Sequence, residues 1–323
     1  MILVCGEALI DLFVETGFAE TGRPASERGG LPALAVAGGS PFNLAVGLSR
    51  LGAGSGFLGG LSGDAFGRML ADRLAAEGVD LAYARTSARP TPLAIVATGP
   101  DGHPAYTFHA ESCAHADLGV GDLPASLPDA VRGIALGSVS LVAEPVGTAY
   151  AALAAREARR RVISLDPNLR LGLIPDLGRW HARFDGLVAC ADIVKLSDED
   201  LRAAYGAGAG EAALAARWLS AGAALVVVTA GPDGARAHHA GGTVAVPGRA
   251  VAVIDTVGAG DSFHAALLAR LDRDGRLARE TLLRLDAEAI GDVLSEAVAA
   301  ASLTCTRRGA DLPTRDALRS ALR

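Results

Sequence analysis

Between about residue 130 and residue 230, short apolar runs alternate with segments of helical pattern, and this alternation restricts the fold more than any other feature of the sequence. The apolar runs are nearly continuous, as in strands that are buried on both faces. Strands joined through helices run parallel in one sheet. We therefore expect an α/β fold with a mostly parallel central sheet covered on both faces by helices. The expected strands are Ile134–Leu136, Val162–Leu165, Ile193–Val194 and Leu225–Thr229, and the expected helices are Val146–Arg159, Arg179–Cys190, Asp198–Tyr205 and Glu211–Ala221.

The first 110 residues add a second set of shorter strands. Ile2–Val4 is expected to join the buried sheet, whereas the later runs are short, alternate in polarity and lie near Gly or Pro. We expect these runs to form a small separate sheet, drawn from about residues 11–16, 32–37 and 92–110, that acts as a lid. Helices are expected over Asn43–Leu51 and Asp64–Glu77. The whole chain, residues 1–323, is expected to be one domain.

Residues 255–261 read Asp-Thr-Val-Gly-Ala-Gly-Asp and predict an anion site. The apolar run Val251–Ile254 is expected to be a strand that leads into a helix through this turn. The first turn of a helix has unpaired N–H groups and a partial positive charge, and Gly258 and Gly260 leave its backbone bare. Asp261 places a carboxylate beside that site, where it could accept a proton from a hydroxyl that attacks phosphorus. The structural alternative is a helix cap.

Polar side chains recur where the expected strands end. In open parallel sheets, ligands bind beyond the carboxyl ends of the strands. Asp11 and Asn43 could accept and donate hydrogen bonds to sugar hydroxyls, and Arg170 offers a planar fork to a phosphate or sugar oxygen. Each could equally be a turn, a helix cap or half of a surface ion pair. The other strand-end clusters are Asp166–Asn168, Ser197–Asp200 and Thr229–Gly231.

Composition excludes several classes of protein. The net charge of −6 argues against a nucleic-acid partner. Lys195 is the single lysine and follows Val194, so a P-loop is excluded, and no His-Arg-Asp string of a protein kinase is present. A dinucleotide-binding Gly-x-Gly-x-x-Gly does not follow the first strand. Four separated cysteines, no signal peptide and no membrane-length apolar run favour a cytoplasmic protein with reduced thiols and no membrane partner.

Two strings of this sequence resemble the signatures of the ribokinase-like (PfkB) carbohydrate kinases. Gly38–Gly67, which contains Gly-Gly-Ser-Pro-Phe-Asn and Gly-Asp-Ala-Phe-Gly, is similar to the N-terminal signature, and Asp255–Asp261 is similar to the second. Within that family, Gly-Glu-Ala-Leu-Ile-Asp, Ser-Leu-Asp-Pro-Asn-Leu-Arg and Val-Lys-Leu-Ser-Asp-Glu-Asp are most similar to bacterial fructokinases. The resemblance implies a ribokinase-like three-layer sandwich with a small β-sheet lid.

The resemblance also implies roles for individual residues. Asp261 would be the catalytic base, and Arg170 would reach the sugar or the transferring phosphate. The amides of Gly258, Ala259 and Gly260 would form the anion hole, and the sugar would be held by Asp11, Gly38, Gly39, Asn43 and Phe108 with Arg170 and Asp261. ATP would be bound by Lys195, Ser197, Thr229, Gly231, Gly234, Gly258, Gly260, Cys305 and Gly309.

Two metal sites follow from the same resemblance. Many relatives carry Asn-x-x-Glu, which organises Mg²⁺ through water, where this chain has Ser197 and Asp200. Asp200 or the adjacent Glu199 would serve that purpose here, although an acidic helix N-terminus explains both residues as well. A monovalent cation, K⁺ for example, would lie near Asp255 and the backbone oxygens of Val257 and Gly309.

The expected reaction is transfer of the ATP γ-phosphoryl group to a primary hydroxyl of a monosaccharide, with D-fructose first. The alternatives are 2-keto-3-deoxygluconate, ribose or a nucleoside, and a sugar-binding regulatory protein without catalysis. An acid substrate would call for an arginine on the lid, and Ala105–His109 contains none, which favours a neutral sugar. Exposed strand edges on the lid favour a homodimer joined through it.

Overall fold

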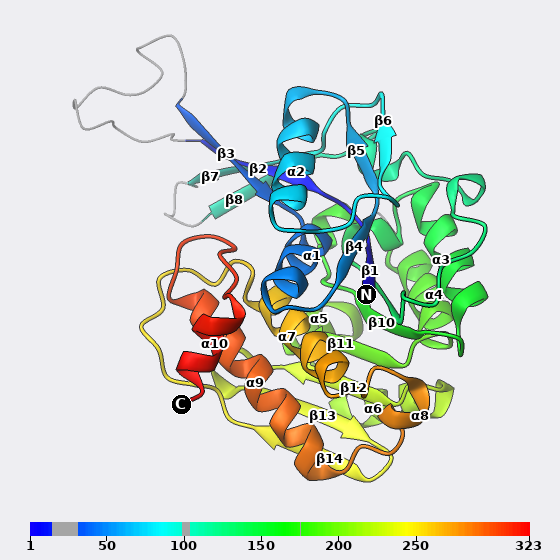
Figure 1. Cartoon of the computed structure of the whole chain (residues 1–323), viewed down its shortest axis with the longest axis vertical. Coiled ribbons are helices and arrows are strands. Elements are labelled where there is room, and N and C mark those ends of the chain that lie inside the picture. Colours follow the sequence, from blue (N-terminus) through cyan, green and yellow to red (C-terminus); the bar gives the residue numbers. More distant parts are fainter. Residues whose placement is uncertain (15–31, 99–103, 175) are drawn as a thin grey trace.

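The computed structural model describes residues 1–14, 32–98, 104–174 and 176–323, and an eight-stranded sheet runs through its centre (Figure 1). All neighbours from β4 to β12 pair in parallel, and β13 and β14 pair antiparallel at one edge. The expected mostly parallel sheet is therefore confirmed. In spatial order the strands are β14 (Gly242–Val246), β13 (Ala235–His239), β12 (Leu225–Thr229), β11 (Ile193–Ser197), β10 (Val162–Asp166), β9 (Gly133–Gly137), β1 (Ile2–Cys5) and β4 (Ser55–Leu58).

Helices cover both faces of this sheet and make three layers. Alternate residues of β1 belong to two different apolar cores, with Ile2 and Val4 in one and Leu3 and Cys5 in the other. The first core is closed by α1 (Ser40–Arg50), α2 (Ala65–Ala76), α7 (Ala259–Arg273), α8 (Arg279–Leu282), α9 (Ala287–Cys305) and α10 (Arg315–Ala321). The second is closed by α3 (Val146–Glu157), α4 (Leu177–Val188), α5 (Asp198–Tyr205) and α6 (Glu211–Ala221).

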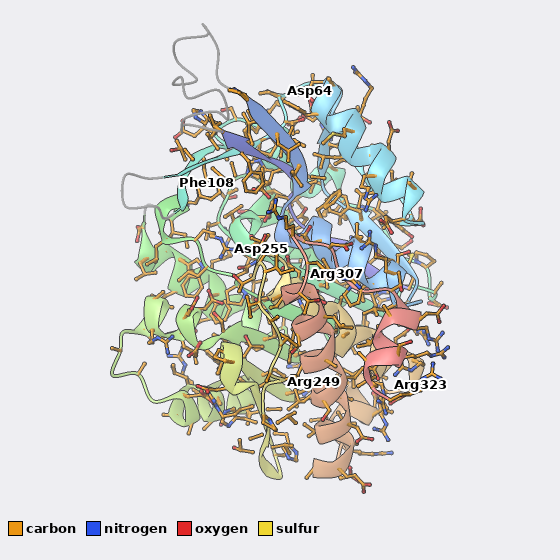
Figure 2. The ribbon with its side chains drawn as sticks, turned by 90° about the vertical axis from the view of Figure 1, so that its left-hand side faces the viewer. Asp64, Phe108, Arg249, Asp255, Arg307 and Arg323 are labelled. Carbon is orange, nitrogen blue, oxygen red and sulfur yellow. The ribbon has the colours of Figure 1, made fainter. Side chains whose placement is uncertain are left out.

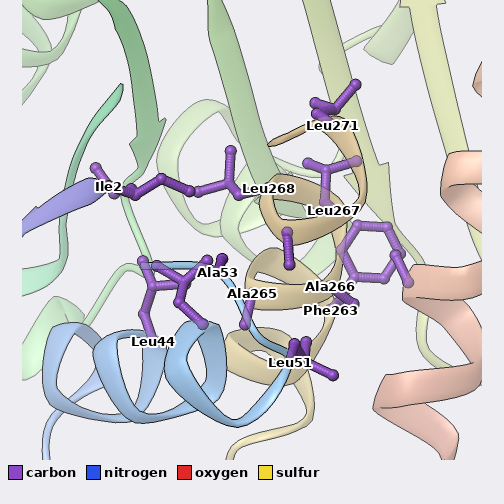
Figure 3. Close-up of a cluster of buried hydrophobic side chains, with 14 of the residues drawn as sticks. Ile2, Leu44, Leu51, Ala53, Phe263, Ala265, Ala266, Leu267, Leu268 and Leu271 are labelled. Atoms are coloured by element: carbon purple, nitrogen blue, oxygen red, sulfur yellow. The ribbon is translucent and has the colours of Figure 1, made fainter. Parts of the chain in front are cut away.

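Helices α1 and α7 pack closely against each other in the first core (Figure 3). A Cβ atom added at Gly47 of α1 would lie 2.8 Å from the Cβ of Ala265 on α7 and 2.4 Å from Leu312 Cδ2. Leu44 and Leu268 fill the space between these helices and the sheet (Figure 3). This contact brings the first turns of α1 and α7 together.

The expected small sheet is present and projects from the main body (Figure 1). Its strands are ordered β3 (Ala33–Gly38), β2 (Leu9–Val14), β7 (Leu93–Thr98) and β8 (Pro104–His109). Ile10, Ala37 and Leu93 pack toward the main core. Asp11 and Phe13 alternate with Ile10 and therefore lie on the other face. Of the predicted ranges, residues 15–16 and 99–103 lie outside the described residues.

The structure corrects one predicted element. Val251–Ile254 forms no strand, and Val251, Val253 and Ile254 are 38, 61 and 62% exposed. The N–H of Ile254 donates at 2.8 Å to the carbonyl of Cys305, at the end of α9, in place of a ladder partner. The apolar composition of this run predicted a buried strand, but its side chains lie on the surface. A surface loop, not a strand, therefore leads into α7.

β5 (Gly60–Ser62) and β6 (Arg85–Ser87) form a parallel pair next to α2. Helix α1 begins at Ser40, three residues before the predicted start, because Pro41 is tolerated in a first helical turn. Within the described ranges, no helix has the length and apolar character needed to cross a bilayer.

Candidate active site

The glycine turn opens helix α7 as predicted. Gly258 is the N-cap residue and has φ 79°, and a Cβ there would lie 2.7 Å from the Cβ of Ala310. Both the left-handed backbone and the close approach of Ala310 therefore require glycine. The N–H of Ala259 donates to the Thr256 carbonyl at 3.2 Å, so one amide of the predicted anion hole already has a protein partner.

Asp261 lies buried in the first turn of α7, and α1 holds both of its oxygens. Ser40 Oγ donates to Oδ1 at 2.6 Å, and Asn43 Nδ2 donates to Oδ2 at 2.8 Å. Burial raises the pKa of Asp261, and the hydrogen bonds from Ser40 and Asn43 and the charge of Lys195 only partly oppose that shift. A carboxylate with a raised pKa, fixed by two donors, is suited to act as a general base.

Asp11 lies near Asp261, on the face of the small sheet that also carries Phe13. Burial raises the pKa of Asp11 to about 6, with Arg170 lowering it and Asp261 raising it further. The structure thus brings Asp11, Arg170 and Asp261 within electrostatic reach of one another. A Cβ at Gly38 would lie 2.2 Å from Asp11 Oδ2, so the glycine makes room for this carboxylate. Gly39 has φ 103° and begins α1 as its N-cap.

A buried ion pair lies next to the glycine turn. Lys195 Nζ donates to Asp166 Oδ2 at 2.7 Å, and the two residues are 4% and 3% exposed. Burial alone would lower the pKa of Lys195, but the neighbouring carboxylates of Asp166, Asp200 and Asp261 outweigh it and raise the pKa. The side chain is therefore a buried cation. A Cβ at Gly260 would lie 3.4 Å from its Nζ.

Asp200 and Glu199, the two carboxylates predicted to organise Mg²⁺, differ in their hydrogen bonds and in their exposure to solvent. Asp200 Oδ1 accepts from the N–H of Leu169 at 2.8 Å and Oδ2 from that of Ser197 at 3.1 Å. Ser197 Oγ in turn accepts from the N–H of Asp200, which makes a capping box for α5. Glu199 is exposed. The described residues contain no group of three or more His, Cys, Asp or Glu side chains that could hold a metal ion.

Asp255 joins the glycine turn to the segment after α9. Its Oδ2 accepts from the N–H of Gly309 at 2.8 Å and its Oδ1 from that of Val257 at 3.1 Å. Gly309 has φ 64°, and Cys305 holds the preceding loop through its carbonyl. Figure 2 shows Asp255 and Arg307 at the middle of one side of the molecule. The predicted residues Asp255, Cys305 and Gly309 are therefore neighbours.

The remaining predicted residues lie at strand ends or turns. Thr229 ends β12, and Gly231 and Gly234 bound the short turn after it, with φ 51° and 90°. A Cβ at Gly234 would lie 2.1 Å from the Val246 carbonyl oxygen, so this glycine is required by packing. Phe108 shares a row of the small sheet with Asp11, two strands away, and borders a hollow of about 410 Å³ that neither Asp11 nor Asp261 lines.

Residues 1–317 match the model of the pfkB family carbohydrate kinases. The chain belongs to this family. It is 41% identical over 290 residues to a fructokinase from Rhizobium leguminosarum bv. trifolii, covering 90% of this chain and 85% of that protein. The resemblance inferred from the two signatures is therefore confirmed, and this PfkB protein is an ATP-dependent carbohydrate kinase.

Solved structures of other kinases share the fold of this PfkB kinase. The fructokinase from Xylella fastidiosa with bound ATP matches with a TM-score of 0.88 and 28% identity, covering 99% of this chain and 97% of that one. A double mutant of the fructokinase from Vibrio cholerae O395, bound to fructose, ADP and potassium ion, matches at 0.82 and 28% identity, covering 100% and 98%. The three-layer fold with a small second sheet is thus confirmed.

The sequence interpretation missed two contributors to the site. Ser40 was not singled out, and Asn43 was assigned to the sugar alone, whereas both hold Asp261. His264 was likewise given no role, and it is buried one helical turn after Asp261, against Ser164. The spacing of three residues between Asp261 and His264 was the available signal, since it places both on one side of α7.

Proposed function

We propose that this kinase transfers the γ-phosphoryl group of ATP to a primary hydroxyl of D-fructose and forms fructose 6-phosphate. The observation that carries the proposal is Asp261, a buried carboxylate with a raised pKa at the first turn of α7, beside a bare glycine backbone. The named relatives and structural neighbours support fructose as the acceptor.

In the proposed mechanism, the chain contributes positioning and charge. Asp261 takes the proton of the attacking hydroxyl while Ser40 and Asn43 fix its orientation. Asp11 and the glycines Gly38 and Gly39 hold the sugar. Backbone amides of Gly258 and Gly260, together with Arg170 and Lys195, stabilise the charge that develops on the transferred group, and the Ala259 amide would join them only on giving up its bond to the Thr256 carbonyl.

The residues present fit ATP at the glycine turn. Gly258 and Gly260 leave the backbone bare, and the Lys195 ammonium lies under the turn, which suits a polyphosphate. Thr229, Gly231, Gly234, Cys305 and Gly309, with Ser197, would border the nucleotide. When bound, ATP supplies the phosphoryl group and Mg²⁺ neutralises its phosphate charge.

The carboxylates near the two proposed metal sites differ in how many oxygen atoms they have left to offer an ion. Glu199 offers an exposed carboxylate to a hydrated Mg²⁺, whereas Asp200 uses both oxygens on backbone N–H groups. We therefore favour Glu199 as the Mg²⁺ contact, through water. Asp255 still has lone pairs beyond its two N–H bonds, and we propose K⁺ beside it with the carbonyl oxygens of Val257 and Gly309.

The charges around Asp11 favour a neutral sugar. Strands β2, β3, β7 and β8 carry no lysine or arginine that could pair with a substrate carboxylate. Arg170 already acts on Asp11. 2-Keto-3-deoxygluconate is accordingly the second candidate, behind fructose, with ribose and nucleosides after it.

We also propose a homodimer that forms through the small sheet, with the whole chain as one domain and the sheet as its lid. Phe13 and Leu34 are direct partners across β2 and β3 and are 38% and 65% exposed. They lie on the same face as Asp11, so a second copy would bury an apolar patch that adjoins the site. A cytoplasmic location stays a prediction.

The decisive experiment measures ADP release by the purified enzyme with ATP and Mg²⁺ against fructose, 2-keto-3-deoxygluconate, ribose, tagatose and adenosine. We expect kcat/KM to be highest for fructose. A higher value for the keto acid would replace fructose with that substrate. Sugar-independent ADP release, or none with any acceptor, would contradict the proposed reaction and favour a sugar-binding regulatory protein.

A further inference from the structure

Four buried polar side chains lie beneath the first turn of α7, and the proposed reaction gives no role to three of them, Ser164, Asp166 and His264. All four, which include Asp166 and Lys195, are at most 4% exposed. His264 Nε2 lies 2.7 Å from Ser164 Oγ, and its Nδ1 lies 3.6 Å from Asp166 Oδ2. Asp166 Oδ2 also accepts from Lys195 at 2.7 Å. The four groups therefore lie in a row from Ser164 to Lys195, with hydrogen bonds at its two ends and a close contact between His264 and Asp166 in the middle.

Strand register and helix spacing bring these groups together. Ser164 and Asp166 are two residues apart on β10 and therefore share a face of the sheet. Leu165 of β10 pairs with Val194 of β11, which places Lys195 beside Asp166. His264 lies above them on α7. Regular elements, not loops, thus fix the positions of all four side chains.

Stability does not explain why a lysine occupies position 195. A buried ion pair repays its desolvation poorly, and apolar residues of similar volume are often as stable or more so. Lys195 is also the single lysine of a chain whose other basic residues are arginines. Arginine is a planar fork, whereas lysine carries a compact point charge. Position 195 therefore requires a compact ammonium group for a reason other than folding.

The location of the ammonium group supplies that reason. It lies under Gly260 at the start of α7, where an anion at the turn would approach it. It also acts on the neighbouring base, because its charge opposes the rise that burial causes in the pKa of Asp261. Displacement of Lys195 would weaken both effects.

His264 is suited to hold this arrangement without adding charge. Burial first, and then the charge of Lys195, lower the pKa of His264 to about 3, so the ring is neutral. A neutral imidazole has one N–H and one acceptor nitrogen. The carboxylate of Asp166 near Nδ1 favours the proton on that nitrogen, which leaves Nε2 to accept from the Ser164 hydroxyl.

We propose that His264, braced by Ser164, is a positioning residue that keeps Asp166 in the orientation that fixes the Lys195 ammonium beneath the glycine turn. This inference rests on the proposed kinase function. His264 is 2% exposed and acts through Asp166 and Lys195. Its loss should therefore lower kcat while the KM for fructose changes little.

Three substitutions separate the two contacts of the ring. His264→Leu removes both at similar volume, His264→Asn keeps a donor at the Nδ1 position, and His264→Gln keeps a polar atom near Nε2. We expect His264→Leu and His264→Gln to lose about 10- to 100-fold in kcat, as for a small misplacement of a reacting group, and His264→Asn to retain most of it. Equal losses in the Asn and Gln variants, or an unchanged kcat in the Leu variant, would overturn the proposal.

The acid limb of the kcat profile supplies a readout that a merely structural role would not move. In His264→Leu it should shift to higher pH, because Asp261 loses the charge that favours its ionised form. An unshifted limb together with a lowered kcat would count against the proposal. The groups that face Asp261 and stay unchanged are Ser40 and Asn43 of α1, Asp166 of β10 and Asp11 of β2.

If His264→Leu fails to fold, a milder variant and crystal structures still test the role proposed for His264. Ser164→Ala removes only the brace and should lower kcat in the same direction by a smaller factor. Crystal structures of the wild type and the variant should show the contact between Lys195 Nζ and Asp166 Oδ2 lengthened or lost. An unmoved ammonium would refute the inference whichever sugar is phosphorylated. Inactivity of the wild type with every sugar would instead refute the proposed function.

Discussion

At the residue scale, the central claim is that Asp261 accepts a proton, and Asp261→Asn tests it. The substitution preserves shape and removes the base, so kcat should fall by about 10²- to 10⁴-fold. Stability should not fall, because burial already disfavours the charged form of this side chain. Initial rates and thermal unfolding measure both quantities. Asp185→Asn, at an exposed ion pair on α4, is the matched control and should leave kcat unchanged.

Asp11 predicts a pH dependence of sugar binding. Its pKa is about 6, raised by burial, so the carboxylate that would accept hydrogen bonds from the sugar is lost as the pH falls below that value. The affinity for fructose should therefore weaken from pH 7 to pH 5. Calorimetric titration without ATP measures this step free of catalysis. Asp11→Asn should bind weakly at every pH, and a persistent pH dependence in that variant would assign it to another group.

The raised pKa of Asp11 has the opposite effect on folding: ionisation of Asp11 favours sugar binding but disfavours the folded state. The native state binds the Asp11 proton more tightly than the unfolded chain, whose pKa is near 3.8. Asp11 therefore disfavours the native state above about pH 6, and this penalty is relieved as the pH falls from about 6 toward 3.8. Sugar binding and stability thus make opposite demands on this carboxylate, as is common for residues of an active site.

The residue types of the site could be predicted from sequence better than their contacts. Asp261, Asp11 and Gly258 were found because each belongs to a recognisable pattern of glycine and carboxylate at a strand or helix end. The hydrogen bonds of Asp261 with Ser40 and Asn43 could not be found, because they join residues more than 200 positions apart. Only the packing of α1 on α7 brings these groups together.

At the scale of elements, the contact between α1 and α7 controls the orientation of the base. Gly47→Ala would place a methyl group 2.4 Å from Leu312 Cδ2 and 2.8 Å from the Cβ of Ala265. Overpacking of this kind costs about 1–3 kcal/mol. Helix α1 would have to move, and it carries Ser40 and Asn43. We expect lower stability in urea unfolding and, in addition, a lower kcat.

A second glycine-to-alanine variant separates packing from helix propensity. Gly186 lies on the exposed side of α4, and a Cβ there would meet no atom within 4 Å. Gly186→Ala should stabilise the protein by roughly 0.5–1 kcal/mol and leave kcat unchanged. If Gly47→Ala behaved in the same way, the close approach of α1 and α7 would not govern the site.

Elements were predicted well where burial and periodicity agree. The parallel strands β9 to β12 are mostly apolar and are buried up to their last residues, so sequence and structure coincide there. Val251–Ile254 is equally apolar and yet lies exposed on the surface. A short apolar run does not reveal whether a neighbouring strand exists to pair with it, and that depends on the whole sheet.

At the scale of the whole molecule, the small sheet is where a second copy is expected. Its exposed pair, Phe13 and Leu34, lies on the face that carries Asp11, so dimer formation would cover apolar surface and also enclose the sugar. Leu34→Ser should weaken the dimer and raise the KM for fructose, because the lid would lose its support. Light scattering should give twice the 32.7 kDa of one chain for the wild type.

Leu283→Ser, at a leucine that is 52% exposed after α8, is the control and should remain dimeric with an unchanged KM. A wild type that stays monomeric at assay concentrations would remove the second copy from the site and leave the lid to close alone.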